Sequence, residues 1–293
     1  MEENYFNILV PVDFSEQSLI ALQQAQTFAK LLNLGIHLLY VEEKAGFSFG
    51  NFIRSHKKYL DDNEAKERLH AISDDFKKQG IVSSVLIREG KVYTHVIELA
   101  KEMESKFIFM GTNSCPSKNE KQYVGSNTLK VTRHAKCPIF TLTGHKTFET
   151  LKTIVLPIDL SKETREKVTV AIPLAKIAGA TIKVVSFFAH KKDREKSNKL
   201  KRQMAHIKEF IEKRDIPCTA EIITIKNSGD DRKMLQEYLK SNNADLVAIM
   251  VQQYADVFEF NAETPTKRFV KSTEIPVLCV PAKATTNLSV KPL

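Results

Sequence analysis

Short apolar runs alternate along the chain with longer segments in which apolar residues recur at helical spacing. The first run, residues 7–15 (NILVPVDFS), ends on Asp13 and Ser15, and Ser15 is well placed to cap a helix. Apolar residues then recur at helical spacing from residue 19 to residue 32, where Asn33-Leu34-Gly35 ends the pattern. This order predicts a buried strand, a turn and an amphipathic helix.

The alternation continues through the first half of the chain. Further strands are expected at residues 35–41, 81–90, 106–111 and 137–143. Helices are expected late in residues 47–80, over 93–105 and over 126–134. Strands that alternate with helices favour right-handed crossovers, so these elements predict a parallel, doubly wound α/β sheet covered on both faces.

The second half repeats this order. Residues 153–161 read TIVLPIDLS, so that Asp159 and Ser161 follow Asp13 and Ser15 at a distance of 146 residues. Later strands are expected at residues 180–188, 218–225, 244–251 and 275–280. Helices are expected around residues 171–177, in a long basic segment ending near 214, and over 231–241. The chain is therefore expected to contain two copies of one α/β unit.

We expect a first domain at residues 1–146, a second at 150–283 and a tail at 284–293. The apolar strands at residues 139–143 and 277–281 end the two copies, and open strand edges invite association. We therefore expect these strands to pair, which would make the chain an intramolecular pseudo-dimer. A homodimer of the whole chain is a further arrangement to consider.

Composition is typical of a soluble globular protein, with 42% apolar and 27% charged residues. No apolar run approaches the roughly 20 residues that span a bilayer, and residues 1–4 lack the basic start of a signal peptide. We therefore expect a cytoplasmic protein with no membrane partner. The four cysteines form no C-x-x-C pair, which argues against a zinc site, and Cys137 and Cys279 are expected to be buried.

The formal net charge of +9 lies mainly in the second half. Lys and Arg number 19 against 17 Asp and Glu in residues 1–146, and 25 against 18 in residues 147–293. Much of the excess falls in residues 191–202 (KKDREKSNKLKR), a stretch without aromatic residues. We expect a solvent-facing helix start that reads no nucleic-acid sequence, although its charge permits weak, salt-sensitive association.

Several motifs occur together in the first half. They are ILVPVDFS in the first strand, LLYV in the second, FMGT after the fourth and VGSNTLKVTRHAKCPIFTL at the end. In this combination the whole chain resembles a tandem member of the universal stress protein family. The resemblance implies two Rossmann-like (adenine nucleotide α-hydrolase-like) domains, each a five-stranded parallel sheet with helices on both faces. It also implies frequent dimerisation and, in one branch of the family, binding of ATP or another adenine nucleotide.

That branch carries G-x-x-G, nine further residues and G-[S/T] after the fourth strand. Here Ser114 replaces the second glycine, and ten residues rather than nine separate it from Gly125. Matching the motif residue by residue assigns a phosphate-binding role to Gly111, Ser114, Gly125, Ser126 and Asn127. Glycines let backbone amides close on a phosphate at a helix amino terminus, so the two departures imply weaker or altered binding in this domain.

The resemblance also implies that Asp13 and the backbone near Val41 face the adenosine part of the ligand, with Mg²⁺ accompanying a triphosphate. Asp13 follows the carboxyl end of the first strand, and ligands of parallel sheets bind beyond the carboxyl ends of the strands where the strand order reverses. The alternative is that Asp13 only caps a turn together with Ser15.

The second half lacks the phosphate loop. Val251 takes the place of Gly111, Glu263-Thr264 takes the place of Gly125-Ser126, and no glycine follows Gly229. A carboxylate at that position would repel phosphate. We therefore expect the second domain not to bind nucleotide, and Asp159 to serve as a turn residue.

Two functions remain open. One is a regulator in the stress response that senses an adenine nucleotide through the first domain. The other is a nucleotide-independent scaffold or binding module for a protein partner. The sequence contains no nucleophile elbow or P-loop and identifies no general base, so no catalytic residue is assigned and at most slow ATP hydrolysis is expected.

Overall fold

A computed structural model describes residues 6–43, 62–112, 125–143, 146–159, 164–188, 194–225, 231–251 and 273–282. The first half contains, in chain order, β1 (Phe6–Pro11), α1 (Glu16–Leu32), β2 (Gly35–Glu42), α2 (Asp62–Lys78), β3 (Ser83–Glu89), α3 (Val92–Glu102), β4 (Phe107–Gly111), α4 (Ser126–His134) and β5 (Ile139–Leu142). This sequence of elements confirms the predicted alternation of strands and helices.

The second half repeats the alternation. Its elements are β6 (Thr153–Pro157), α5 (Thr164–Ala178), β7 (Thr181–Phe188), α6 (Arg194–Glu212), β8 (Cys218–Thr224), α7 (Asp231–Ser241), β9 (Leu246–Val251) and β10 (Val277–Pro281). The long basic helix predicted to end near residue 214 is α6.

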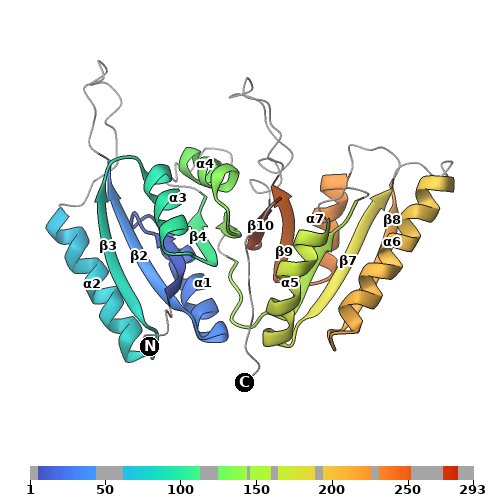
Figure 1. The fold of residues 1–293 in the computed structure, drawn as a ribbon, viewed down its shortest axis with the longest axis horizontal. Helices are drawn as coiled ribbons and strands as arrows, with labels where there is room; N and C mark the ends of the chain where they lie inside the picture. Colours follow the sequence, from blue (N-terminus) through green and yellow to red (C-terminus); the bar gives the residue numbers. More distant parts are fainter. Residues whose placement is uncertain are drawn as a thin grey trace, which may run out of the picture.

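All these strands join one ten-stranded sheet in the order β3-β2-β1-β4-β5-β10-β9-β6-β7-β8. Neighbouring strands within each half are parallel, whereas β5 and β10 are antiparallel, with Phe140 opposite Leu278. The predicted pairing of the two terminal strands is confirmed. Figure 1 shows the two halves side by side, with β10 near the middle and the edge helices α2 and α6 at the two ends.

Helices cover both faces of the sheet. On one face α1, α2, α5 and α6 contribute to a continuous apolar core, and on the other α3, α4 and α7 do so. Phenylalanines mark the centre of the first core: Phe109 stacks on Phe140 at 4.3 Å between ring centroids, and Phe28 of α1 meets Phe140 edge-on at 4.7 Å. The doubly wound α/β class is confirmed.

A glutamine clamp holds the connection between the two halves. Gln24 of α1 is fully buried, and its side-chain amide donates to the carbonyl oxygen of Phe148 at 3.1 Å. Its Oε1 accepts from the N–H of Phe148 at 2.9 Å. Phe148 lies between β5 and β6 and is itself buried. Gln24 therefore satisfies both backbone groups of a buried connector residue.

Most local predictions agree with the structure. Ser15 caps α1, and Asn33 ends that helix with φ 51°. Cys137 and Cys279 are buried, as expected. Leu19 differs, because its place in the apolar pattern implied burial and it is 42% exposed. The rest of the predicted pattern is largely confirmed, since Leu22, Ala25, Phe28 and Ala29 are buried on the face of α1 that packs on the sheet.

Candidate functional site

In the first half the strand order reverses between β1 and β4. The two strands are parallel neighbours, with Leu9 paired to Ile108. The chain continues from β1 towards β2 and β3 on one side, and from β4 to β5 on the other. Open parallel sheets bind ligands beyond the carboxyl ends of strands at such a reversal. Asp13 follows β1 and Gly111 ends β4, so both residues lie at this edge.

Asp13 shapes the turn between β1 and α1. Its Oδ1 accepts hydrogen bonds from the backbone N–H of Ser15 at 3.0 Å and from the Ser15 hydroxyl. Ser15 in turn accepts from the N–H of Ser18 at 3.3 Å. Phe14, between Asp13 and Ser15, has φ 59°, which is uncommon outside glycine. Asp13 therefore has the turn role considered as an alternative, and its side chain is also exposed at the edge of the sheet.

Gly111 is required by the packing of β4 against α1. A Cβ atom added there would lie 2.5 Å from both the carbonyl carbon and the carbonyl oxygen of Gln17. Only glycine permits that approach. Gln17 is itself 8% exposed, and its buried Oε1 has no hydrogen-bond partner in the part of the chain that the structure describes. Gly111 thus has a structural reason that the loop motif did not reveal.

The start of α4 is held against the end of β4. The N–H of Gly125 donates to the carbonyl oxygen of Thr112, and the hydroxyl of Thr128 donates to the carbonyl oxygen of Gly111 at 2.9 Å. Gly125 is the N-cap and provides no side-chain cap, and the first turn of α4 has no acidic residue. An amino terminus of this kind, with its unpaired N–H groups and positive dipole end, suits an anion.

The other residues assigned from the sequence are distributed around this edge. Ser126 is exposed and Asn127 half-buried in the first turn of α4. Val41 is half-buried near the end of β2, opposite Arg88 of β3. Ser114 lies outside the described residues. The structure therefore brings Asp13, the end of β4 and the start of α4 to one edge, and leaves Ser114 untested.

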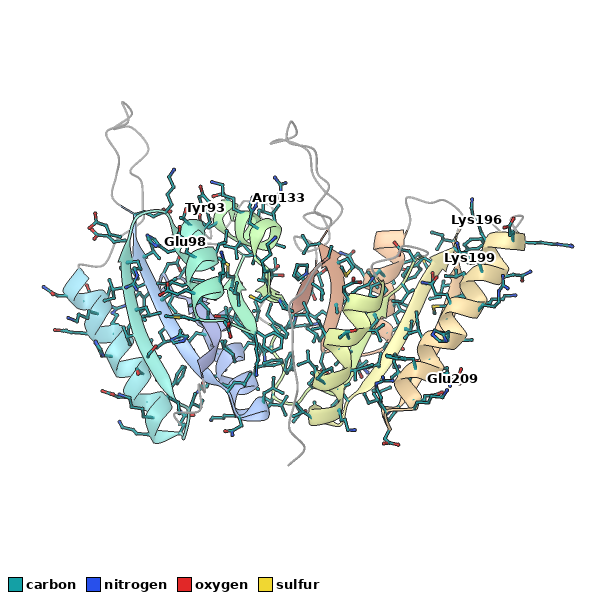
Figure 2. The ribbon with its side chains drawn as sticks, viewed as in Figure 1. Tyr93, Glu98, Arg133, Lys196, Lys199 and Glu209 are labelled. Carbon is teal, nitrogen blue, oxygen red and sulfur yellow. The ribbon has the colours of Figure 1, made fainter. Side chains whose placement is uncertain are left out.

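Two exposed cations lie along α4, beyond its first turn. Lys130 lies over the ring of Tyr93 in α3, with 4.4 Å from Nζ to the ring centroid. Figure 2 shows Tyr93 and Glu98 of α3 on the same side of the first half as Arg133 of α4. Lys130 and Arg133 are both exposed. Arg133 lies at the carboxyl end of α4, where it complements the negative end of the helix dipole, so these cations do not belong to the anion site at the helix start.

The matching edge of the second half is built differently. Val251, at the end of β9, is 5% exposed. Lys167 of α5 is 6% exposed, and its ammonium group donates to the carbonyl oxygen of Pro157 at 2.5 Å. A buried cation therefore reaches the end of β6. The first half has no such cation, because the corresponding residue is Ala21. Asp159 is exposed, and Glu263-Thr264 lie outside the described residues.

The thiols in the described chain are not activated for nucleophilic chemistry. Burial raises the pKa of Cys137 and of Cys279 to about 12, and burial together with the charge of Glu212 raises that of Cys218 to about 11. All three are therefore neutral near pH 7. Within the described ranges, no three His, Cys, Asp or Glu side chains form a group that could hold a metal ion.

No described helix combines the length and the apolarity needed to cross a membrane. A small hollow lies far from the edge that carries Asp13, between the end of α1 and the start of β3. It is lined in part by Lys30, Asn33, Gln79 and Val82. Its position at the amino ends of the strands is not where parallel sheets bind their ligands.

The comparison with known families decides the identity of this fold. The sequence profile of the universal stress protein family matches residues 4–142 and again residues 150–281. The chain belongs to the universal stress protein family. Universal stress protein G of Escherichia coli O157:H7 is 32% identical over 141 residues, which are 46% of this chain and 96% of that protein. Two universal stress protein domains therefore follow one another in this chain.

Solved universal stress proteins share the fold. One from Archaeoglobus fulgidus DSM 4304 has a TM-score of 0.73 at 20% identity, covering 96% of this chain and all of that one (100%). A universal stress protein from Archaeoglobus fulgidus in complex with dAMP covers 44% of this chain and 97% of that one, with 14% identity and a TM-score of 0.36. The first comparison extends the likeness in fold over both domains.

Three residues that shape these two edges were not found from sequence: Gln17 and Thr128 at the candidate site, and Lys167 at the matching edge of the second domain. Gln17 and Thr128 act through backbone contacts that only the packing of helices on β4 creates. Lys167 could have been noticed in the sequence, because it is a charged residue beside Val168 and Ala171 in the apolar stripe of a helix. Its carbonyl partner, however, lies in a different element.

Proposed function

We propose that this universal stress protein is a regulator in the stress response and that its first domain binds one adenine nucleotide per chain, such as ATP. The observation that carries the proposal is the amino terminus of α4. It begins at Gly125 without a side-chain cap or an acidic first turn, and two hydrogen bonds hold it at the end of β4 beside the strand reversal.

In this proposal the phosphates lie at the backbone of Gly125, Ser126 and Asn127, with Ser114 contributing from the preceding loop. Asp13 and the backbone at Val41 contact the adenosine part. Gly111 acts indirectly, because its contact with Gln17 sets the distance between β4 and α1. The exposed carboxylate of Asp13 and the N–H groups of α4 suit the two ends of a nucleotide, and Mg²⁺ accompanies a triphosphate there.

The second domain serves as a structural partner without nucleotide. Val251 is buried where the first domain has Gly111, and the ammonium group of Lys167 lies at the end of β6. Val251 therefore places a side chain where Gly111 lies against the backbone of α1, and Lys167 places a cation where the first domain has Ala21. The domain boundaries at residues 146 and 150, a homodimer and a cytoplasmic location stay predictions.

Isothermal titration of the full-length chain with ATP tests the proposal. The expected result is one binding site per chain, abolished by Gly125→Val, because a branched side chain blocks close approach of the phosphates to the backbone. Asp159→Ala, at the matching turn of the second domain, is the control and should bind like the unmodified protein. Binding that survives Gly125→Val refutes the site, and no binding to the unmodified chain favours a nucleotide-independent scaffold.

A further inference from the structure

Helix α6 presents a wide surface at the outer end of the second domain. Its buried stripe consists of Leu200, Met204, Ile207 and Ile211, which pack on the sheet. Figure 1 shows α6 at the edge of the molecule, beyond β8. The side of α6 that faces away from this stripe is therefore accessible over the length of the helix.

The first half of α6 carries a dense group of cations. They are Arg194, Lys196, Lys199, Lys201 and Arg202, all of which are exposed. Glu195 is the acidic residue in the range 194–202. Figure 2 shows Lys196 and Lys199 towards one end of α6 and Glu209 towards the other. We refer to these five cations as the α6 basic surface.

Ion pairing differs sharply between the two halves of α6. In the described part of the chain, Arg194, Lys199, Lys201 and Arg202 make no ion pair. In the second half, by contrast, Lys208 pairs with Glu212 at 2.5 Å and Lys213 with Glu209 at 2.7 Å. The charges of these four cations are therefore not neutralised by ion pairs in the described part of the chain.

The order of charges in α6 also runs against its dipole. Arg194 and Lys196 flank Glu195 in the first turn, where a helix favours anions, so that turn has a net positive charge, and the last turn has no basic residue. The helix at the opposite end of the sheet, α2, begins Asp62-Asn63-Glu64 and ends with two lysines, as the dipole favours. The helix dipole therefore gives no stability reason for Arg194 and Lys196 at this end of α6, where an external anion would be stabilised.

We propose that the α6 basic surface binds the phosphate backbone of double-stranded DNA without reading its sequence. At about 100° per residue, Arg202 points away from the buried Leu200, while Lys199 and Lys201 lie on opposite flanks of the helix. A helix about 10–12 Å across fits the major groove of B-DNA, about 12 Å wide, where phosphates line both sides. Cations on both flanks match that arrangement.

Other anionic partners fit this surface less well. A bilayer is a plane, so it would meet the crest at Arg202 and leave one flank or the other without a partner. The major groove of duplex RNA is too deep and narrow to admit a helix. A folded acidic protein rarely matches the charge density of duplex DNA, which carries one charge per about 1.7 Å of its axis. Residues 194–202 contain no aromatic side chain on which unpaired bases could stack, which favours duplex over single-stranded nucleic acid.

Fluorescence anisotropy of the full-length chain with a labelled duplex of about 20 base pairs, from about 50 to about 200 mM salt, tests the proposal. The variant Lys199→Gln/Lys201→Gln/Arg202→Gln removes three exposed cations from α6. The matched control, Lys66→Gln/Lys77→Gln/Lys78→Gln, removes three exposed cations from α2 and lowers the net charge equally.

We expect the α6 variant to bind at least about tenfold more weakly at low salt. The slope of log affinity against log salt should fall by about 2–3, since each lost phosphate contact accounts for about 0.9. The α2 variant should keep the slope of the unmodified protein. Two duplexes of unrelated sequence should bind equally.

Three results overturn the proposal. The first is equal weakening in both variants, which would attribute binding to net charge alone. The second is no DNA binding at low salt, whether or not phosphatidylserine vesicles bind. The third is a strong preference for one of the two duplexes. ATP titrations of the same variants should match the unmodified protein, so that this test stays separate from that of the nucleotide site.

Discussion

Replacing Gln24 by leucine removes the clamp on the connector between the two domains while nearly preserving side-chain volume. In the structure the Gln24 amide satisfies both the N–H and the carbonyl group of Phe148, at 2.9 and 3.1 Å, in a fully buried setting. Leucine can make neither bond. Both backbone groups of Phe148 would then remain buried without partners.

Each buried backbone group left unsatisfied costs about 1–3 kcal/mol, and the greater apolar burial of leucine offsets part of this. We therefore expect Gln24→Leu to lower the free energy of unfolding by about 2–4 kcal/mol. The effect should act on the junction itself, because Gln24 belongs to the first domain and Phe148 to the segment that leads into the second.

Urea unfolding followed by circular dichroism measures this loss. Gln23→Leu is the matched control, since Gln23 is the preceding residue of α1 and is exposed. The control should stay within about 0.5 kcal/mol of the unmodified protein. If Gln24→Leu were equally neutral, the clamp would contribute nothing to stability and the reasoning from buried hydrogen bonds would be refuted.

Three further changes have defined outcomes. Gly111→Ala should lower the free energy of unfolding by about 2–4 kcal/mol, because the added methyl group would lie 2.5 Å from the backbone of α1. Iodoacetamide at about pH 8 should leave Cys137 and Cys279 unmodified in the folded chain, since burial raises the pKa of each to about 12. Tyr238→Phe removes a hydrogen bond of 3.1 Å to Glu221. Burial, and then the charge of Glu221, raises the pKa of Tyr238. The stability that the hydroxyl contributes should therefore be complete below about pH 10 and decline as the pH rises further.

Each outcome has a direct check. Urea unfolding of Gly111→Ala should be compared with that of the unmodified chain, and equal stability would mean that β4 and α1 can separate at little cost. Peptide mapping identifies the alkylated cysteines, and rapid labelling of Cys279 before unfolding would contradict its burial. For Tyr238→Phe, unfolding is measured from pH 7 to above pH 10. A difference from the unmodified chain that does not narrow at high pH would contradict the raised pKa.

The strands and helices could be predicted because their hydrophobic periods are strong and occur twice. The strand expected at residues 35–41 is β2, Gly35–Glu42, and the helix expected at 126–134 is α4, Ser126–His134. The pairing of β5 with β10 followed from a simple physical argument, that two apolar edge strands in one chain gain by satisfying each other.

The candidate site could be predicted only in part, because its residues act through tertiary contacts. Asp13 was placed correctly at the end of a strand, but its bond to Ser15 shows a turn role that the sequence allowed without choosing. Gly111 was assigned to phosphate, whereas its contact with Gln17 provides an independent reason for glycine. That contact depends on how closely α1 approaches β4, which no local pattern encodes.

A crystal structure of the full-length chain grown with ATP and Mg²⁺ tests the central claim most directly. We expect one nucleotide per chain, with its phosphates beside the backbone of Gly125 and at the N–H groups of Ser126 and Asn127, and with its adenosine between Asp13 and Val41. The edge formed by β6 and β9 should hold no nucleotide, with Lys167 still donating to the carbonyl oxygen of Pro157. Nucleotide density at that second edge, or phosphates away from the start of α4, would contradict the account.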